Sequence, residues 1–106
     1  MTVEVGVSAA LARQIAGAFG PEPDAAGSPS EWDFWGGPLA AALVGFRDFE
    51  ELGFTYAPEV RSLHVVDPVF GPVVFVGVLV KPGVVELDAF RRDPDYWTVI
   101  DVEPND

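Results

Sequence analysis

The chain of 106 residues contains no cysteine and a single histidine, His64. Disulfide frameworks and thiolate metal centres are therefore excluded, and so is a zinc site built from several histidines. Long apolar runs are also absent, since none approaches the ~20 residues that span a bilayer. Residues 1–4 lack the basic start of a secretion signal. We expect a cytoplasmic protein without a membrane contact, a metal or a cofactor.

Basic residues are scarce as well. Six Lys and Arg stand against 17 Asp and Glu, which gives a net charge of -11. This charge opposes nucleic-acid binding, because that affinity depends on basic residues that release counterions. It favours a basic protein partner. The same charge also serves the solubility of a small domain.

Apolar residues are plentiful, at 49% with eight Phe and three Trp, enough for one core. We predict a single domain over residues 1–106, with 20–37 as a loop insertion between two helices. In that loop Ser30 and Asp33 resemble a capping pair, which predicts one short helical turn after Ser30. Five of the six bases are arginine, which is typical of GC-rich bacterial coding.

Apolar residues at spacings of three and four predict helices over 8–19 and 38–52. Ser8 is suited to cap the first helix, and Gly53 to end the second. Short β-branched runs predict strands at 3–7, 60–66, 73–80, 84–90 and 97–102. Pro82 and Gly83 fit a type II turn. Because the connections are short, we predict a two-layer α+β fold: an antiparallel meander of four to five strands with two helices on one face.

We predict that Val66 pairs with Val73 and Val80 with Val85. Because side chains alternate along a strand, this register determines which residues share each face of the sheet. The core face would then be wholly aliphatic, with Leu63, Val65, Val74, Val76, Val78, Val80, Val85, Leu87 and Ala89. The outer face would mix aromatic, acidic and small residues: Ser62, His64, Phe75, Gly77, Leu79, Glu86, Asp88, Phe90, Trp97 and Asp101.

The polar residues of this outer face are the candidates for catalysis. An acid, Glu86 or Asp88, would orient His64 as a general base. Ser62 lies two residues from His64 on one strand, however, and sharing a face does not establish the geometry of a triad. An ordinary solvated sheet face is the more frequent outcome. The acidic residues lack the spacing of a calcium-binding loop.

Two further groups are candidates for binding. Trp32, Phe34 and Trp35 form an aromatic cluster, of which one ring is expected to close the core and another to serve an interface. Arg91 and Arg92 precede an aromatic pair, Tyr96 and Trp97, and two arginines suit a carboxylate or phosphate. Asp93 and Asp95 lie beside them and would neutralise them. We therefore take as candidate binding residues Trp32, Trp35, Arg91, Arg92, Tyr96 and Trp97.

The order strand–helix–helix–antiparallel sheet resembles that of the small bacterial RelE/ParE toxins over most of the chain. No sequence motif carries this resemblance, and those toxins are typically basic whereas this chain is acidic. It implies a divergent toxin relative as one interpretation.

We favour instead a non-enzymatic module that engages a basic partner, such as an immunity protein, an antitoxin or a phage-type inhibitor. A homodimer through the outer sheet face is a second version of this interpretation. The alternative is a small enzyme or ligand-binding protein built around His64, Glu86 and Asp88, with a pocket opened by Gly77.

Overall fold

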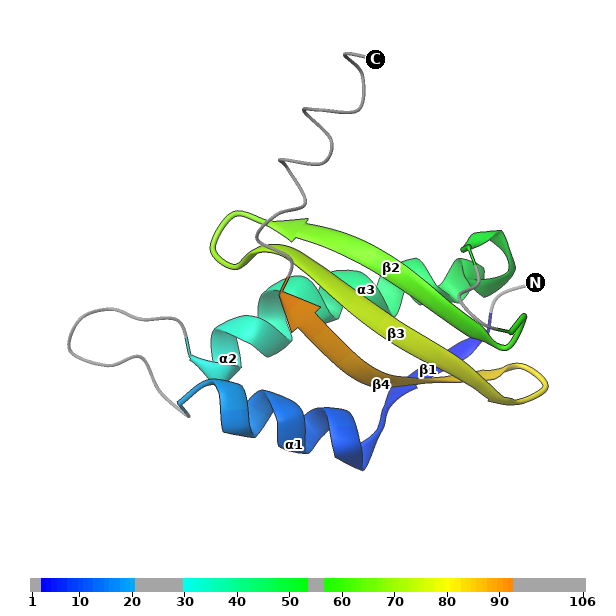
Figure 1. Cartoon of the computed structure of the whole chain (residues 1–106), viewed down its shortest axis with the longest axis horizontal. Coiled ribbons are helices and arrows are strands. Elements are labelled where there is room, and N and C mark those ends of the chain that lie inside the picture. The colour runs from blue at the N-terminus through cyan, green and yellow to red at the C-terminus, as the bar shows by residue number, and fades with distance from the viewer. Residues whose placement is uncertain (1–2, 21–29, 54–56, 93–106) are drawn as a thin grey trace, which may run out of the picture.

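The computed structural model describes residues 3–20, 30–53 and 57–92. The chain is α+β, as predicted, with a mixed four-stranded sheet in the order β1-β4-β3-β2 (Figure 1). The strands are β1 (Glu4–Val7), β2 (Val60–Asp67), β3 (Gly71–Lys81) and β4 (Val84–Arg92). The helical elements are α1 (Ala9–Ala18), α2 (Glu31–Phe34), the π-helical turn η1 (Trp35–Leu39), α3 (Ala40–Gly45) and the 3₁₀ segment η2 (Phe46–Glu51).

The sheet is only in part the predicted antiparallel meander. Strands β2, β3 and β4 pair antiparallel, but β1 pairs with β4 in parallel. The prediction is wrong for this pair because β1 is separated from the other strands by the helices, and the long connection permits a parallel neighbour. The predicted strand at 97–102 lies outside the described residues.

Helix α1 begins as predicted, since the Ser8 hydroxyl accepts a hydrogen bond from the backbone N–H of Leu11 at 3.0 Å. Helix α1 also contacts the end of β4. Strand β1 ends opposite Leu87, and beyond that point the Gln14 side chain donates to the Phe90 carbonyl and accepts from the Phe90 N–H. This side chain therefore occupies part of a strand edge that would otherwise be open.

The second helical region begins earlier than predicted, at residue 31 rather than 38. Ser30 and Asp33 form the reciprocal bonds of a capping box. Pro38 lies inside the helix and has no N–H, so the α-helical ladder is interrupted and widens into the π turn η1. The second half of the predicted loop 20–37 is therefore helical, and residues 21–29 lie outside the described part.

The β2–β3 connection sets a pairing that differs from the predicted one. The Asp67 carboxylate accepts from the backbone N–H groups of Val69 at 2.8 Å and Phe70 at 3.0 Å. Gly71 follows with a φ of +74°, which closes a three-residue loop. Val66 consequently pairs with Pro72 and not with Val73. A slip of one residue moves every side chain of β3 to the other face.

The β3–β4 connection has the predicted type II geometry, since Gly83 has a φ of +80°. Bulges follow at Val80 and Asp88, because such turns match the twist of a hairpin poorly. Of the predicted core residues, Val74 is buried but stands outside the main core cluster, and Val76, Val78, Val80 and Ala89 are more exposed and also lie outside that cluster. The predicted outer residues Phe75, Gly77, Leu79 and Phe90 occupy the inner alternation with Val85 and Leu87.

The core is built mainly from phenylalanine rings. Phe34 and Phe75 are fully buried, and they join a cluster with Phe19, Phe70 and Phe90 whose ring centroids lie 4.6–6.3 Å apart. Leu11 and Ile15 of α1 belong to the same core. In Figure 1 α3 passes behind β2 and β3, so the viewer looks onto the other face of the sheet.

Candidate functional site

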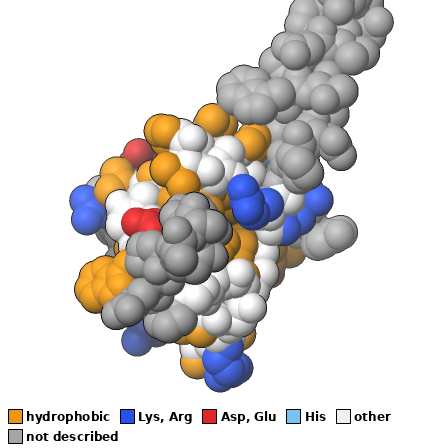
Figure 2. All heavy atoms as spheres, turned by 90° about the vertical axis from the view of Figure 1, so that its left-hand side faces the viewer, with side chains coloured by type: hydrophobic (Ala, Val, Ile, Leu, Met, Phe, Trp, Pro, Cys, Tyr) orange, Lys and Arg blue, Asp and Glu red, His pale blue; other side chains and the backbone are white. Residues whose placement is uncertain are grey.

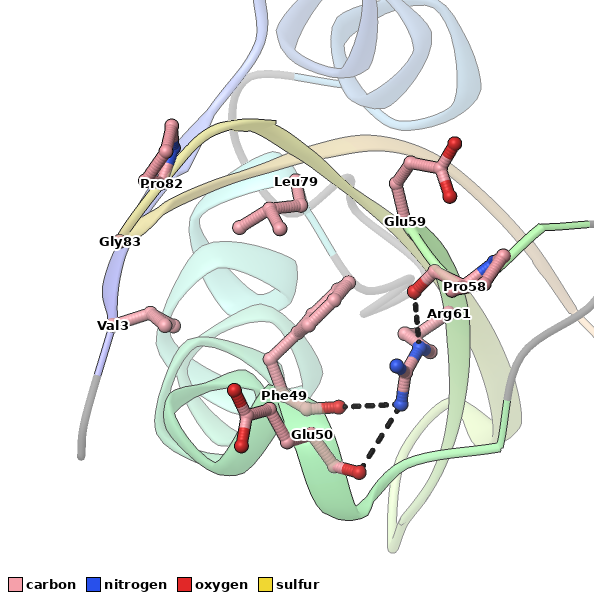
Figure 3. A pocket seen from close by; sticks show the side chains of 9 residues that line it. All are labelled: Val3, Phe49, Glu50, Pro58, Glu59, Arg61, Leu79, Pro82 and Gly83. Carbon is pink, nitrogen blue, oxygen red and sulfur yellow. Dashed lines mark hydrogen bonds between the residues drawn. The ribbon is translucent and has the colours of Figure 1, made fainter.

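A pocket of about 420 Å³ opens where the start of β1, η2 and the β3–β4 turn meet (Figure 3). This volume is within the range of small-molecule and side-chain sites. Its interior is apolar, whereas the carboxylates of Glu50 and Glu59 lie on opposite sides of it. The lining residues are Val3, Phe49, Glu50, Pro58, Glu59, Arg61, Leu79, Pro82 and Gly83.

Arg61 forms one wall of this pocket and closes the end of η2. Its guanidinium donates to the carbonyl oxygens of Pro58 at 2.6 Å, Phe49 at 3.1 Å, Glu50 at 3.2 Å and also Leu52. It also lies 4.8 Å from the centroid of the Phe49 ring. The last carbonyls of a helix lack the usual partners within the helix; the Leu52 N–H donates to Phe49, and Arg61 supplies further donors to Phe49 and Glu50.

The sequence interpretation did not identify Arg61. A signal was nevertheless present, because Arg61 alternates with Leu63 and Val65 and so belongs to the inner side of β2. A cation on the inner side of a sheet needs specific hydrogen-bond partners. Four backbone carbonyls supply them here.

Arg61→Lys is expected to lower the free energy of unfolding by about 1.5–3 kcal/mol, the contribution of hydrogen bonds to a charged group. A lysine has a single ammonium and cannot reproduce the planar fork that reaches several carbonyls. Urea denaturation followed by circular dichroism measures the change. Arg13→Lys, on the exposed side of α1, is the matched control and should be neutral. Equal stability of the two variants would contradict the capping role.

The surroundings of the pocket are acidic. Lys81 precedes the β3–β4 turn and Arg47 lies in η2, and they face a larger set of exposed acids at this end: Glu4, Asp48, Glu50, Glu51 and Glu59. Over the described residues, ten acids stand against six bases, a net charge of -4. Five of the ten acids of the described residues are thus at the end of the chain's fold that holds the pocket.

The candidate catalytic residues do not come together. His64 pairs with Val74, whereas Glu86 pairs with Val78, four residues along β3. By strand geometry the two are about 13 Å apart along the strands and about 10 Å across them. Glu86 and Asp88 do lie close together: desolvation at the sheet face, a hydrogen bond that protonated Glu86 donates to Asp88, and the negative charge of Asp88 raise the pKa of Glu86.

The aromatic cluster is divided between core and surface. Phe34 is fully buried, and Trp35 is half-buried and packs against the core. Trp32 is 77% exposed, which leaves it accessible to a partner. Figure 2 shows the end of the molecule opposite the pocket, where hydrophobic, basic and acidic side chains are interspersed.

The two arginines of the third candidate group point to different faces of the sheet. Arg92 donates from Nε and Nη2 to the Phe70 carbonyl at 3.2 and 2.8 Å, and lies over the Phe70 ring. Arg91 pairs with Val74 and shares the outer face with it. They do not form a joint anion clamp in this arrangement. Tyr96 and Trp97 lie outside the described residues.

Within residues 3–20, 30–53 and 57–92, no three His, Asp or Glu side chains are grouped so as to hold a metal ion. No helix in these ranges is long and apolar enough to cross a membrane. No family model matches the chain, and no curated protein or solved structure matches it either.

Proposed function

We propose that the chain is a small acidic protein-binding module whose pocket receives a cationic side chain of a basic partner. The observation that carries the proposal is the apolar interior of the pocket between the exposed carboxylates of Glu50 and Glu59. Lysine and arginine have the matching chemistry, an apolar stem and a charged head. Restraint of a basic target by an immunity protein, an antitoxin or a phage-type inhibitor is the role that this chemistry supports.

A lysine or arginine side chain would make two kinds of contact in this pocket, one apolar and one charged. The stem would pack against Val3 and Leu79, and the head would lie between Glu50 and Glu59. Arg61 places a positive charge at one wall, but four backbone carbonyls accept from its guanidinium and hold it, and with Glu50 and Glu59 the lining still has a net charge of -1. A preformed site reduces the entropic cost of binding.

We further propose the predicted two-layer arrangement, in which the helices cover one face of the sheet. The pocket then lies at one end of the sandwich, beside η2 and the β3–β4 turn. Binding there leaves the other face of the sheet unused.

The test is a nuclear magnetic resonance titration with a short peptide of alternating arginine and glycine. The methyl signals of Val3 and Leu79 are expected to shift, because the stem packs on them. The double variant Glu50→Gln/Glu59→Gln is expected to weaken binding roughly 10-fold or more, which corresponds to ~1.4 kcal/mol. A peptide of glutamate and glycine should cause no shift.

Asp48→Asn/Glu51→Gln is the matched control. It removes the same charge from the same end of the molecule, but neither residue lines the pocket. Binding should weaken less than about 3-fold, since long-range attraction is screened by salt. Equal losses in both double variants, or unshifted Val3 and Leu79 methyls, would mean nonspecific attraction and overturn the proposal.

A further inference from the structure

We propose that the outer face of the sheet is the interface of a symmetric homodimer, in which two sheets stack with their strands antiparallel. The middle of this face is a row of three valines on β3, Val74, Val76 and Val78. The one-residue slip in pairing leaves these side chains outside the main core cluster, where Val76 and Val78 are half-buried and Val74 is 5% exposed. Figure 1 looks onto this face, with α3 on its far side.

The strand pairing arranges the charges of this face in an order. His64, Val74 and Arg91 lie side by side at one level of the sheet. Val78 and Glu86 lie side by side four residues away along β3, and Asp88 lies close to Glu86. The face therefore has a basic end, an apolar middle and an acidic end.

A twofold axis at the level of Val76, parallel to the sheets and perpendicular to the strands, makes this face complementary to itself. Val76 then meets its own copy, and Val74 meets Val78 of the second copy. On the neighbouring strand Arg91 lies over the Glu86 of the second copy. Both copies make every contact, as an isologous interface requires. Packed sheets lie about 10 Å apart, within reach of an arginine side chain.

The order of the charges along the outer face favours a second copy of the chain as its partner. A uniformly basic partner would be repelled by Arg91 at one end of the face. A uniformly acidic partner would be repelled by the end with Glu86 and Asp88. A second copy in antiparallel orientation satisfies both ends and covers the valines between them. Repulsion between the net charges is screened at physiological salt, where the Debye length is ~8 Å.

This dimer is independent of the proposed function, although the two are compatible. The pocket is lined by Leu79 and Arg61 from the inner alternation of the sheet, together with η2. Stacking through the outer face therefore leaves both pockets open. The dimer is tested on the protein alone, so its failure and a failure of basic-peptide binding are distinguishable.

The experiment is sedimentation equilibrium of the full chain at pH 7 and physiological salt, from roughly 10 to 500 µM, the range for a modest interface. The wild-type mass is expected to rise toward that of two copies. Arg91→Glu and Glu86→Arg should each remain monomeric, because each brings like charges together. The double variant Glu86→Arg/Arg91→Glu should dimerise again, since the pairs are restored in reverse.

Lys81→Glu is the matched control, with the same change of charge as Arg91→Glu at an exposed position beside the turn. It should still dimerise. A wild-type chain that is monomeric throughout, a loss with Lys81→Glu equal to that with Arg91→Glu, or a double variant that stays monomeric overturns the proposal. Should a reversal disturb folding, isotope-filtered contacts between Val76 methyls in mixed-label wild-type protein decide the matter, and their absence also overturns it.

Discussion

Phe34→Ala is expected to lower the free energy of unfolding by about 3–5 kcal/mol, the cost of removing a buried aromatic ring. Phe34 is fully buried, and its ring centroid lies 5.0 Å from that of Phe19, 5.3 Å from Phe70 and 4.6 Å from Phe90. The variant leaves a cavity where α2 meets the sheet. Urea denaturation followed by near-ultraviolet circular dichroism measures the loss.

Trp32→Ala, two residues away in the same short helix, is the control. Its side chain is 77% exposed, so stability should change by less than about 0.5 kcal/mol. A loss comparable to that of Phe34→Ala would contradict the assignment of Phe34 to the core and Trp32 to the surface. The pair of variants thus tests which member of the sequence-predicted aromatic cluster supports the fold.

Gly77→Ala is the second change with a large expected effect. A Cβ atom at this position would lie 2.5 Å from Cε1 and 2.8 Å from Cδ1 of Phe46, and 3.2 Å from Cδ2 of Leu87. Both neighbours are fully buried and have no free space to enter. Overpacking of this kind costs about 1–3 kcal/mol, and the expected loss is at the upper end. Thermal denaturation should show a midpoint lowered by roughly 10 °C or more.

Gly6→Ala is the matched strand control. A Cβ atom at Gly6 would meet nothing within 4 Å, so the substitution should leave stability unchanged or slightly increased. If Gly77→Ala were as stable as Gly6→Ala, the close contact of β3 with Phe46 would be wrong. The predicted role of Gly77, to open a pocket on the outer face, would then need to be considered again.

Local chemistry was enough to predict much of this fold from the sequence. Ser8 caps α1, and Pro82-Gly83 forms a type II turn, because both depend on neighbours within four residues. The described strands begin and end close to their predicted positions for the same reason. The capping box at Ser30 was also visible, although Pro38 concealed that the helix continues through a π turn.

The candidate site was not accessible in this way, because its residues come from separate parts of the chain. Val3, Phe49 and Leu79 are brought together only when β1 joins β4 in parallel and η2 packs beside them. Arg61 becomes a cap only after β2 passes the end of η2. The residue pattern of a single segment cannot predict that these segments lie side by side.

The sequence by itself determined an acidic α+β chain, the start of α1 at Ser8 and the Pro82-Gly83 turn, since charge and short-range propensity are properties of the chain. The tertiary structure alone decided which face of β3 belongs to the main core cluster. Val74 and Phe75 are both apolar, so the alternation of the strand is consistent with either face. The Asp67 loop and the space that Phe46 takes over Gly77 favour one pairing, and a shift of one residue exchanges the two faces.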